Sequence, residues 1–461
     1  MQNREFCSIV LAAGAGTRMK SEVPKMMHKV AHKSMIEHVL DQIDLLQPIK
    51  NYIVYGYKGE MLQDHLSART NLIWAYQDKQ LGTAHATKVA ADLIAENVTT
   101  LVLFSDNPLI KASTLEKLLE QVEQGADLAL LTTYLDNPYG YGRVVKDANG
   151  NICAIVEQKD SNPEQQAIKE VYTGILAINS KNLQNLLAQV DNKNANNEYY
   201  LTDIIKLASQ AGQKVTSVAT TPLEVSSANT KFQLAQLEDY YQQSKMQELA
   251  EQGLSLRSTM PGTFALRGEL TFDEDCEVDL NCQFNGQVQL GKRVKIGQGC
   301  IITNATIGDD TVIEPYTIIE NASVGNGCAI GPFARLRPNS QILDKAKVGN
   351  FVETKNTTLG VGSKANHLAY LGDTTVGSKV NIGAGVITCN YDGANKFKTI
   401  IGDNVFVGSD CQLVAPVTIA DGATIAAGTT VLKNVEGAYL VLNPKQTKVN
   451  PDWQRPEKIK K

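Results

Sequence analysis

The chain has 461 residues, of which 20% are charged, and a formal net charge of −5 at pH 7. This length exceeds the size at which one hydrophobic core keeps growing, so two domains are expected. The charges form no long runs of one sign, which disfavours nonspecific electrostatic binding to nucleic acid or to an anionic membrane. No apolar run approaches the ~18 residues of a membrane span, and the first residues lack the pattern of a cleavable signal. We therefore expect a soluble, cytoplasmic protein.

From residue 6 to about residue 225, short apolar runs alternate with segments of helical periodicity. The runs FCSIVLAA, NYIVYGY, TTLVLFSD and ADLALLTTYL are typical of strands, and ASTLEKLLEQVEQG is typical of a helix. This alternation predicts a mostly parallel sheet covered by helices. A proline-free segment follows and predicts a long helix, which could join two domains or lie on the surface of one. We expect a first domain over residues 1–229, a linker helix over 230–252 and a second domain over 253–461.

Beyond residue 280, aliphatic residues recur every six positions, often followed by glycine. A step of six residues with one inward aliphatic side chain predicts a parallel β-helix built of hexapeptide repeats. The period slips by one residue from Ile302 to Ile307 and from Leu371 to Val376. The segment TCNYDGANKFKT should be a loop that leaves the β-helix, and such loops are often functional. The regular positions are Ile318, Val324, Ile330, Leu336, Ile342 and Val348, and later Ile401, Val407, Leu413, Ile419, Ile425 and Val431.

The eight cysteines are scattered along the chain. They include no C-x-x-C pair and no cysteine–histidine cluster of zinc spacing, so buried free thiols are expected.

The segment LAAGAGTRMKSEVPK, from Leu11 to Lys25, follows an apolar strand and is rich in glycine. Backbone N–H groups of such a loop can approach an anion closely. The segment lacks the third glycine of a dinucleotide fingerprint, where Met19 stands, and it lacks a Walker lysine. Hydride transfer and simple ATP hydrolysis are thus disfavoured. Arg18 and Lys25 could neutralise a triphosphate, although a plain tight turn explains the glycines equally well.

Asp106 stands at the carboxyl end of the strong strand in LVLFSDNPLI. Open α/β sheets bind ligands at this edge, and a carboxylate there can hold Mg²⁺ against phosphates. Taken alone, such an aspartate is as often a helix cap as a metal ligand. Together with QDKQLGTAHA and GYGRVV, it indicates a nucleotide site.

These motifs, with VEQKD, YTGIL and NEYYLTDII, resemble those of the sugar-nucleotide pyrophosphorylases. Combined with the repeats, the whole chain resembles the bacterial bifunctional N-acetylglucosamine-1-phosphate uridyltransferases/glucosamine-1-phosphate N-acetyltransferases. The resemblance implies an α/β Rossmann-like nucleotidyltransferase domain followed by a left-handed parallel β-helix. It also implies attack of a sugar-1-phosphate on the α-phosphorus of UTP with Mg²⁺ and release of pyrophosphate. The product, UDP-N-acetylglucosamine, is a precursor of peptidoglycan and lipopolysaccharide.

The resemblance assigns residues of the first domain to ligands. Asp106 and Asn229 correspond to the Mg²⁺ ligands, Lys25 to a phosphate contact, and Gly142 and Glu157 to sugar contacts. Ser105, Tyr172 and Ser227 stand where the family usually has glycine, asparagine and glycine, and the asparagine contacts the sugar nucleotide. The remaining uridine nucleotide contacts fall on Leu11, Ala12, Ala13, Gly14, Gln77, Gly82 and Thr83.

His367, in GSKANHLAYLGD, is the one histidine of six that lies in the repeat region. Histidine is suited to take a proton from an amine near neutral pH. A lone histidine is more often a solvated turn residue. However, GPFARLRP and VGNFVETK place Arg337 and Lys355 upstream at a spacing of about 18 residues, which can bring them to one face of a β-helix. Two cations beside a base suit a phosphorylated amine.

The resemblance makes His367 the proton acceptor of acetyl transfer, with acetyl-CoA as the donor. Arg337 and Lys355 correspond to anchors of the glucosamine-1-phosphate, and Tyr370 and Asn381 to further contacts. The family assembles as homotrimers with this site between subunits. Its basic coenzyme A contact near the carboxyl terminus falls on Pro444, beside Lys445. The acetyl-CoA contacts fall on Ala384, Asn390, Tyr391, Ser409, Ala427 and, by this substitution, Lys445.

Two other functions remain open on the sequence. One is a single pyrophosphorylase that makes an ADP- or GDP-sugar and whose β-helix only oligomerises or regulates. The other is a non-enzymatic trimeric scaffold or sugar-nucleotide sensor. His367 and NYDGANKFKT count against the first, and the altered positions Ser105 and Tyr172 are the best support for the second.

Overall fold

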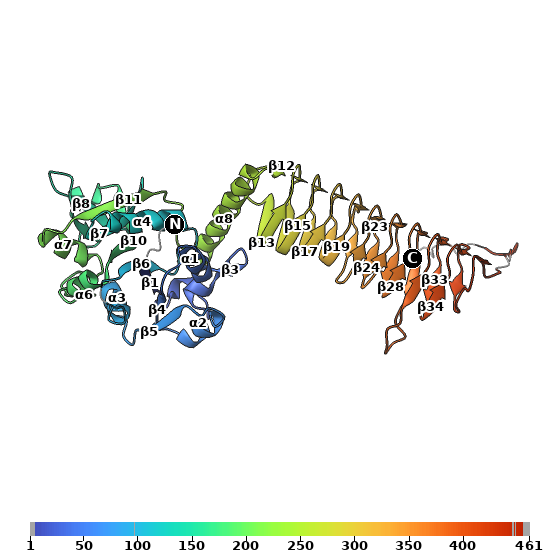
Figure 1. Ribbon diagram of the computed structural model, residues 1–461, viewed down its shortest axis with the longest axis horizontal. Helices are drawn as coiled ribbons and strands as arrows, with labels where there is room; N and C mark the ends of the chain where they lie inside the picture. Colours follow the sequence, from blue (N-terminus) through green and yellow to red (C-terminus); the bar gives the residue numbers. More distant parts are fainter. Residues whose placement is uncertain (1–4, 96, 445–446, 448, 455–461) are drawn as a thin grey trace, which may run out of the picture. The chain divides into compact units, whose positions relative to one another are not determined.

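The computed structural model describes residues 5–95, 97–444, 447 and 449–454. The chain forms two compact units, Met1–Tyr241 and Gln242–Lys461 (Figure 1). In the described part of the chain, no helix has both the length and the apolar character that a membrane crossing requires.

The first unit is built on a mixed sheet of order β11-β7-β10-β6-β1-β4-β5. Its strands are parallel except β10, which runs antiparallel to both β6 and β7. A hairpin of β8 and β9 is attached to β10. The expected mostly parallel sheet is thus confirmed. The strands are β1 (Phe6–Leu11), β4 (Asn51–Tyr55), β5 (Leu72–Tyr76), β6 (Thr99–Phe104), β7 (Leu128–Tyr134), β8 (Arg143–Lys146), β9 (Ile152–Val156), β10 (Glu170–Asn179) and β11 (Val215–Thr220).

Helices cover both faces of this sheet, so each central strand is buried on both sides. In β1, Phe6 and Val10 join the core beneath α1 and α4, whereas Cys7, Ile9 and Leu11 join the core beneath α3, α6 and α7. The short pieces are η1 (Thr17–Met19), η2 (Lys25–Met27), β2 (Lys29–Val30) and β3 (Lys33–Ser34). The helices are α1 (Met35–Asp44), α2 (Gly59–His65), α3 (Thr83–Ala91), α4 (Ala112–Glu123), α5 (Pro163–Gln166), α6 (Ser180–Leu187) and α7 (Asp203–Gln210).

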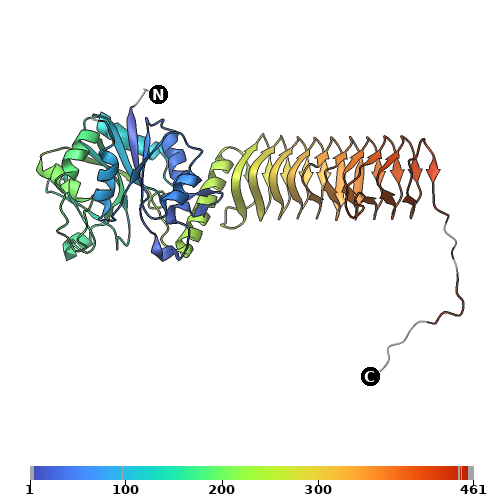
Figure 2. The same cartoon turned by 90° about the horizontal axis from the view of Figure 1, so that it is seen from below.

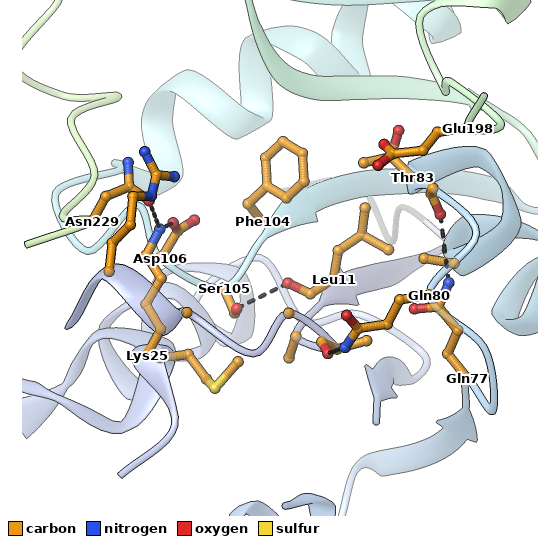
Figure 3. Close-up of a pocket in the computed structure, with 18 residues that line it drawn as sticks. Leu11, Lys25, Gln77, Gln80, Thr83, Phe104, Ser105, Asp106, Glu198 and Asn229 are labelled. Carbon is orange, nitrogen blue, oxygen red and sulfur yellow. Dashed lines mark hydrogen bonds and ion pairs between the residues drawn. The ribbon is translucent and has the colours of Figure 1, made fainter. Parts of the chain in front are cut away.

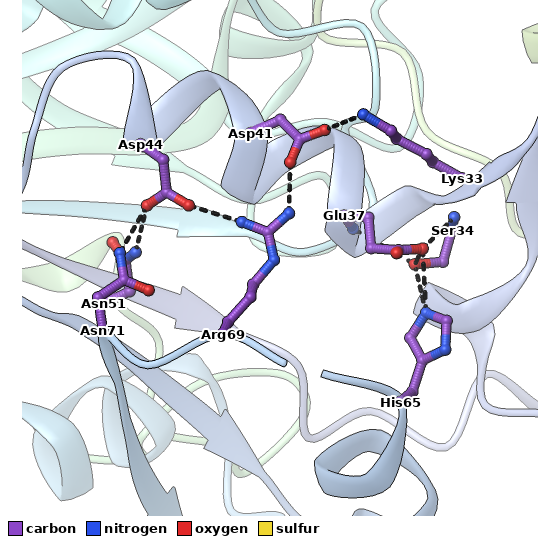
Figure 4. Close-up of polar contacts among 9 residues, drawn as sticks. All are labelled: Lys33, Ser34, Glu37, Asp41, Asp44, Asn51, His65, Arg69 and Asn71. Carbon is purple, nitrogen blue, oxygen red and sulfur yellow. Dashed lines mark hydrogen bonds and ion pairs between the residues drawn. The ribbon is translucent and has the colours of Figure 1, made fainter. Parts of the chain in front are cut away.

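A polar network fixes α1 to its neighbours (Figure 4). Ser34 and Glu37 form a capping box at the start of α1, which satisfies amide groups that the first turn leaves unpaired. At the other end, Arg69 donates to Asp44 at 2.6 Å and to Asp41. These bonds hold α1 against the loop that leads into β5.

The long helix α8 (Lys231–Glu251) occupies the segment for which a linker helix is expected, and the border between the two units falls within it. Its first half contributes Leu237 and Tyr241 to a small core with Val30 and Met35. Its second half contributes Met246 and Leu249 to the core of the second unit.

The second unit is a parallel β-helix, in which each strand pairs in parallel with the strand one coil later. Figure 2 shows the coils stacked along its length. One sheet contains β12 (Ser255–Leu256), β14 (Glu277–Val278), β16 (Lys295–Ile296), β18 (Val312–Ile313), β20 (Ala329–Ile330), β23 (Lys347–Asn350), β26 (Lys364–His367), β29 (Asn381–Ile382), β32 (Phe406–Val407), β35 (Thr424–Ile425) and β37 (Leu440–Val441). The other contains β13 (Phe264–Phe272), β15 (Cys282–Leu290), β17 (Ile301–Ile307), β19 (Ile318–Val324), β21 (Arg335–Leu336), β22 (Gln341–Ile342), β24 (Glu353–Lys355), β25 (Thr358–Leu359), β27 (Tyr370–Gly372), β28 (Thr374–Val376), β30 (Ile387–Cys389), β31 (Thr399–Ile401), β33 (Gln412–Val414), β34 (Val417–Ile419) and β36 (Thr430–Val431).

The inward positions follow the predicted six-residue period with one correction. Ile318 is 39% exposed, and its neighbour Ile319 is the buried residue. The step from Ile319 to Val324 is therefore five residues long, the same slip that Ile302 to Ile307 shows. The other eleven predicted aliphatic positions are buried. All eight cysteines are free, and six are buried, as the sequence predicts.

The predicted loop leaves the β-helix after β30 and returns at β31. Residues 391–396 are exposed, and an isolated antiparallel bridge joins Tyr391 to Lys396. The loop therefore has its own local hairpin-like structure.

Candidate active sites

A cavity of about 430 Å³ opens at the carboxyl ends of β1 and β6 in the first unit (Figure 3). Twelve residues singled out in the sequence line it: Leu11, Ala12, Ala13, Gly14, Arg18, Lys25, Gln77, Gly82, Thr83, Ser105, Asp106 and Asn229. Sequence reasoning did not assign six further lining residues: Gly16, Met26, Gln80, Ala86, Phe104 and Glu198. All of these except Met26 lie within motifs quoted above, so a signal for them was present.

One end of the cavity gathers oxygen ligands around a cation. The Lys25 ammonium donates to Asn229 Oδ1 at 2.7 Å and forms an ion pair with Asp106 Oδ2. Two oxygens from distant parts of the chain thus face one positive group. A carboxylate and an amide oxygen are ligands that Mg²⁺ accepts, usually completed by waters and substrate phosphates. Among the described residues, no cluster of three or more His, Cys, Asp or Glu side chains forms an all-protein metal site. The donor set therefore fits a metal that the nucleotide helps to hold.

The opposite end of the cavity, beyond Leu11 and Phe104 in Figure 3, is formed by the loop before α3. Gly82 has φ +119°, and a Cβ there would lie 2.4 Å from the Tyr199 carbonyl oxygen, so only glycine fits. Gln77 contacts His85 Nδ1 at 3.0 Å through its side-chain nitrogen, and Gln80 donates to the Ala13 carbonyl at 2.7 Å. Thr83 Oγ1 accepts a bond from the Leu201 amide at 3.0 Å. These contacts fix the side chains of Gln77, Gln80 and Thr83 at this end of the cavity.

Ser105, which replaces the glycine of the resembling enzymes, does not leave a free hydroxyl in the cavity. Its Oγ donates to the Leu11 carbonyl at 2.8 Å, and its amide donates to the same oxygen at 3.2 Å. The serine therefore fastens the end of β6 to the end of β1. This departure is compatible with an open nucleotide pocket.

The two predicted sugar contacts, Gly142 and Glu157, lie together with Tyr172, and none of the three lines the cavity. A Cβ at Gly142 would be 3.4 Å from Glu157 Oε1, and the Gly142 carbonyl accepts the Tyr172 amide at 2.9 Å. Thr202 donates to Glu157 Oε1 at 3.2 Å. The buried Tyr172 hydroxyl has no hydrogen-bond partner among the described residues.

Burial governs the titration of this cluster. Desolvation raises the pKa of Glu157, the nearby Asp160 and Asp203 raise it further, and Thr202 and Arg143 oppose the shift. Burial also raises the pKa of Tyr172, so its phenol stays protonated. The cluster therefore combines the Glu157 carboxyl group, whose ionisation is disfavoured, with the neutral hydroxyl of Tyr172.

In the second unit, His367 is the last residue of β26 and is exposed. Its Nδ1 lies 3.1 Å from Asn350 Oδ1 on the preceding coil. The amide oxygen can only accept, so this contact places the imidazole proton on Nδ1 and leaves Nε2 as a proton acceptor. In this tautomer, Nε2 is the ring nitrogen that can take a proton from another group.

The predicted phosphate anchors lie on the neighbouring sheet, across the corner at Leu368. Arg337 is paired with Glu353 at 2.7 Å. The pKa of Lys355 is lowered, first by contact with Lys396 and then by the charges of Lys396 and Arg337. Three cations thus converge, which suits a phosphate group. Sequence reasoning missed Lys396, although it lies in the quoted loop motif.

Tyr370 and Asn381 lie on different sheets of the β-helix. Tyr370 pairs with Glu353 in the sheet that carries the cations. Asn381 pairs with Lys364 of β26, the strand that ends at His367. The same register places Ala384 one coil after His367.

Three of the predicted acetyl-CoA residues, Ala384, Ser409 and Ala427, lie on successive coils. The Ala384 carbonyl accepts a hydrogen bond from the Asp410 amide, and Asp410 follows Ser409 in the chain. The Ser409 carbonyl in turn accepts a hydrogen bond from the Gly428 amide, and Gly428 follows Ala427. Tyr391 is 60% exposed in the loop, whereas Asn390 is only 8% exposed and donates to Asp373 at 2.5 Å. Lys445 lies outside the described residues.

Comparison with known proteins identifies the two parts of the chain. Residues 7–222 match the nucleotidyl transferase family. Residues 266–340 match the GMPPB C-terminal domain, and residues 398–433 match the bacterial transferase hexapeptide of six repeats. A solved structure of a putative glucose-1-phosphate thymidylyltransferase from Bacillus anthracis, in complex with a sucrose, is 20% identical over 51% of this chain and 94% of that chain, with a TM-score of 0.42. The chain therefore has a first unit that is similar to nucleotidyl transferases, followed by a parallel β-helix with hexapeptide repeats.

Proposed function

We propose that the protein makes UDP-N-acetylglucosamine in two steps, acetyl transfer in the second unit followed by uridyl transfer in the first. The observation that carries the uridyl transfer is the convergence of Lys25, Asp106 and Asn229 at one end of the nucleotidyltransferase cavity. The sequence resemblance supplies the identity of the substrates. The protein would act in the cytoplasm as a homotrimer.

In the uridyl transfer, a phosphate oxygen of N-acetylglucosamine-1-phosphate attacks the α-phosphorus of UTP. The new P–O bond forms as the bond between the α- and β-phosphates breaks, and pyrophosphate leaves. Arg18 and Lys25 neutralise the triphosphate, and a Mg²⁺ ion held by Asp106 and Asn229 would withdraw charge from its phosphates. The reaction needs positioning and charge neutralisation more than a covalent nucleophile, and the cavity offers these groups.

In the acetyl transfer, His367 Nε2 takes a proton from the 2-amino group of glucosamine-1-phosphate as the nitrogen attacks the thioester carbonyl. The C–S bond then breaks, and coenzyme A leaves with a proton on sulfur. Arg337, Lys355 and Lys396 hold the phosphate of the acceptor. The product of this site is the acceptor of the uridyl transfer, which sets the order of the two reactions.

One finding favours a single-function pyrophosphorylase that makes a GDP-sugar: the match of residues 266–340 to the GMPPB C-terminal domain. That stretch ends before Lys355, His367 and the loop. The cation cluster and the Nδ1 contact of His367 have no role in that function. Consumption of acetyl-CoA with glucosamine-1-phosphate separates the two proposals.

The proposed function is tested by assaying both half-reactions in two variants. Asp106→Ala should lower Mg²⁺-dependent pyrophosphate release by ~10³-fold and leave acetyl transfer within about two-fold. His367→Ala should lower acetyl transfer by ~10²-fold or more and leave pyrophosphate release unchanged. Asp136→Ala, which removes an exposed carboxylate of the first unit, is the control. Retained activity in either variant would overturn the role of that residue.

A further inference from the structure

We propose that Asp373 is a positioning residue of the acetyl-transfer site, because it holds the loop Asn390–Lys398 so that Lys396 stands beside Lys355. The inference rests on the proposed function for its substrate. Its structural part concerns only bonds within the β-helix.

The backbone of Asp373 joins the two coils on either side of it. Asp373 follows β27 at a left-handed corner with φ +49°. Its amide donates to the Lys355 carbonyl at 3.0 Å, and its carbonyl accepts the Thr399 amide at 3.2 Å. One residue thus connects the coil that carries Lys355 to the point where the chain re-enters the β-helix after the loop.

The Asp373 carboxylate fixes the other end of the loop. Oδ2 accepts a hydrogen bond from the Asn390 side-chain amide at 2.5 Å, and Oδ1 accepts one from the Asn356 side-chain amide at 2.6 Å. The Asn390 carbonyl accepts the Phe397 amide at 2.9 Å, which closes the loop. Both ends of the loop therefore meet at Asp373.

The loop needs such an anchor because of what it carries. Lys396 stands against Lys355 with Arg337 close by, and these like charges repel. The negative charge of Asp373 opposes the fall in the pKa of Lys355. The carboxylate thus holds the loop by a hydrogen bond and partly compensates the positive charge of Lys355. A cluster of cations that the protein's own bonds hold together is pre-organised for a phosphate.

The substitution Asp373→Asn tests this role with little risk to the fold. Asparagine tolerates the left-handed conformation, so the corner is preserved. The substitution removes the negative charge of residue 373. It also leaves a single side-chain oxygen, which replaces the two that accept from the side-chain amides of Asn356 and Asn390. The matched control is Asp310→Asn, since Asp310 is also a corner aspartate, with φ +57°, and is paired with Arg293 away from the site.

Hydrogen–deuterium exchange decides the structural claim without any substrate. In Asp373→Asn, amides of residues 391–398 should exchange ~10-fold faster, whereas Asp310→Asn should match the wild type there. Unchanged exchange would overturn the proposal. Because this readout needs no turnover, a wild type without acetyl transfer would refute the proposed function alone.

A double-mutant cycle decides whether Asp373 acts through Lys396. Asp373→Asn and Lys396→Met should each raise the KM for glucosamine-1-phosphate by about 10-fold, and the double variant should be no worse than Lys396→Met. The alkaline limb of the pH profile should also move to lower pH in Asp373→Asn, because Lys355 loses its compensating charge. Additive effects on KM, or an unchanged pH profile, would contradict the proposal.

Discussion

In the proposed sugar site, burial raises the pKa of the Glu157 carboxyl group. Its pKa is raised mainly by desolvation, so it takes up a proton at a higher pH than the ~4.3 of a free glutamate. Protonation removes a charged acceptor for sugar hydroxyls. We therefore predict that the KM for N-acetylglucosamine-1-phosphate falls as pH rises through this raised pKa. Steady-state kinetics of pyrophosphate release over pH 5–8 measures this KM. Glu157→Gln should abolish the dependence, and an unchanged dependence in that variant would assign it to another group.

Tyr172 is the residue at which this chain departs most from the enzymes it resembles. Its hydroxyl is buried without a hydrogen-bond partner among the described residues, and such a group costs about 1–3 kcal/mol. Tyr172→Phe keeps the ring and removes the hydroxyl, so we predict a higher free energy of unfolding for the first unit, measured by chemical denaturation. A decrease would show that a bound water or another group satisfies the hydroxyl.

Residue identities could be predicted from the sequence better than residue contacts. The glycine loop and Asp106, which lie in quoted motifs, line one cavity with Asn229, which only the resemblance assigned. The position of the Lys25 ammonium between two oxygens, the bond of Ser105 to Leu11 and the contact of Lys396 with Lys355 could not be predicted. Each joins groups that are distant in sequence, and their contact depends on the pairing of strands and coils.

At the scale of elements, α1 is attached by charged bonds in addition to its buried apolar face. Arg69 bridges Asp41 and Asp44 from a half-buried position. Arg69→Met should lower the free energy of unfolding of the first unit by about 1–2 kcal/mol, since hydrogen bonds to charged groups are lost. Lys88→Met, which removes an exposed pair with Asp92 on α3, should change it by less than about 0.5 kcal/mol. Equal effects in thermal or chemical unfolding would contradict this ranking.

The elements themselves were largely predictable because hydrophobic periodicity determines them. The six-residue period identified the inward positions of the β-helix, and its one error, Ile318 for Ile319, arose where a five-residue step interrupts the period. The antiparallel direction of β10 and the β8–β9 hairpin were not predictable. Strand direction depends on which neighbours pair, and that information is absent from the period of a single strand.

At the scale of the whole molecule, the two proposed sites lie in two separate compact units. The residues of the nucleotide cavity all belong to residues 1–241, and those around His367 all belong to residues 242–461. Each site can therefore be disabled by substitutions that leave the other unit intact. The link between the two reactions lies in the product of the second unit, which the first unit would consume.

Product analysis tests the central claim most directly. Purified protein is mixed with glucosamine-1-phosphate, acetyl-CoA, UTP and Mg²⁺, and the products are followed in time by mass spectrometry. The proposed function predicts N-acetylglucosamine-1-phosphate first, then UDP-N-acetylglucosamine with an equal amount of pyrophosphate. His367→Ala should form UDP-N-acetylglucosamine only when N-acetylglucosamine-1-phosphate is supplied. A nucleotide sugar formed without acetyl transfer, or an acetylated sugar phosphate that is never uridylated, would contradict the two-step function.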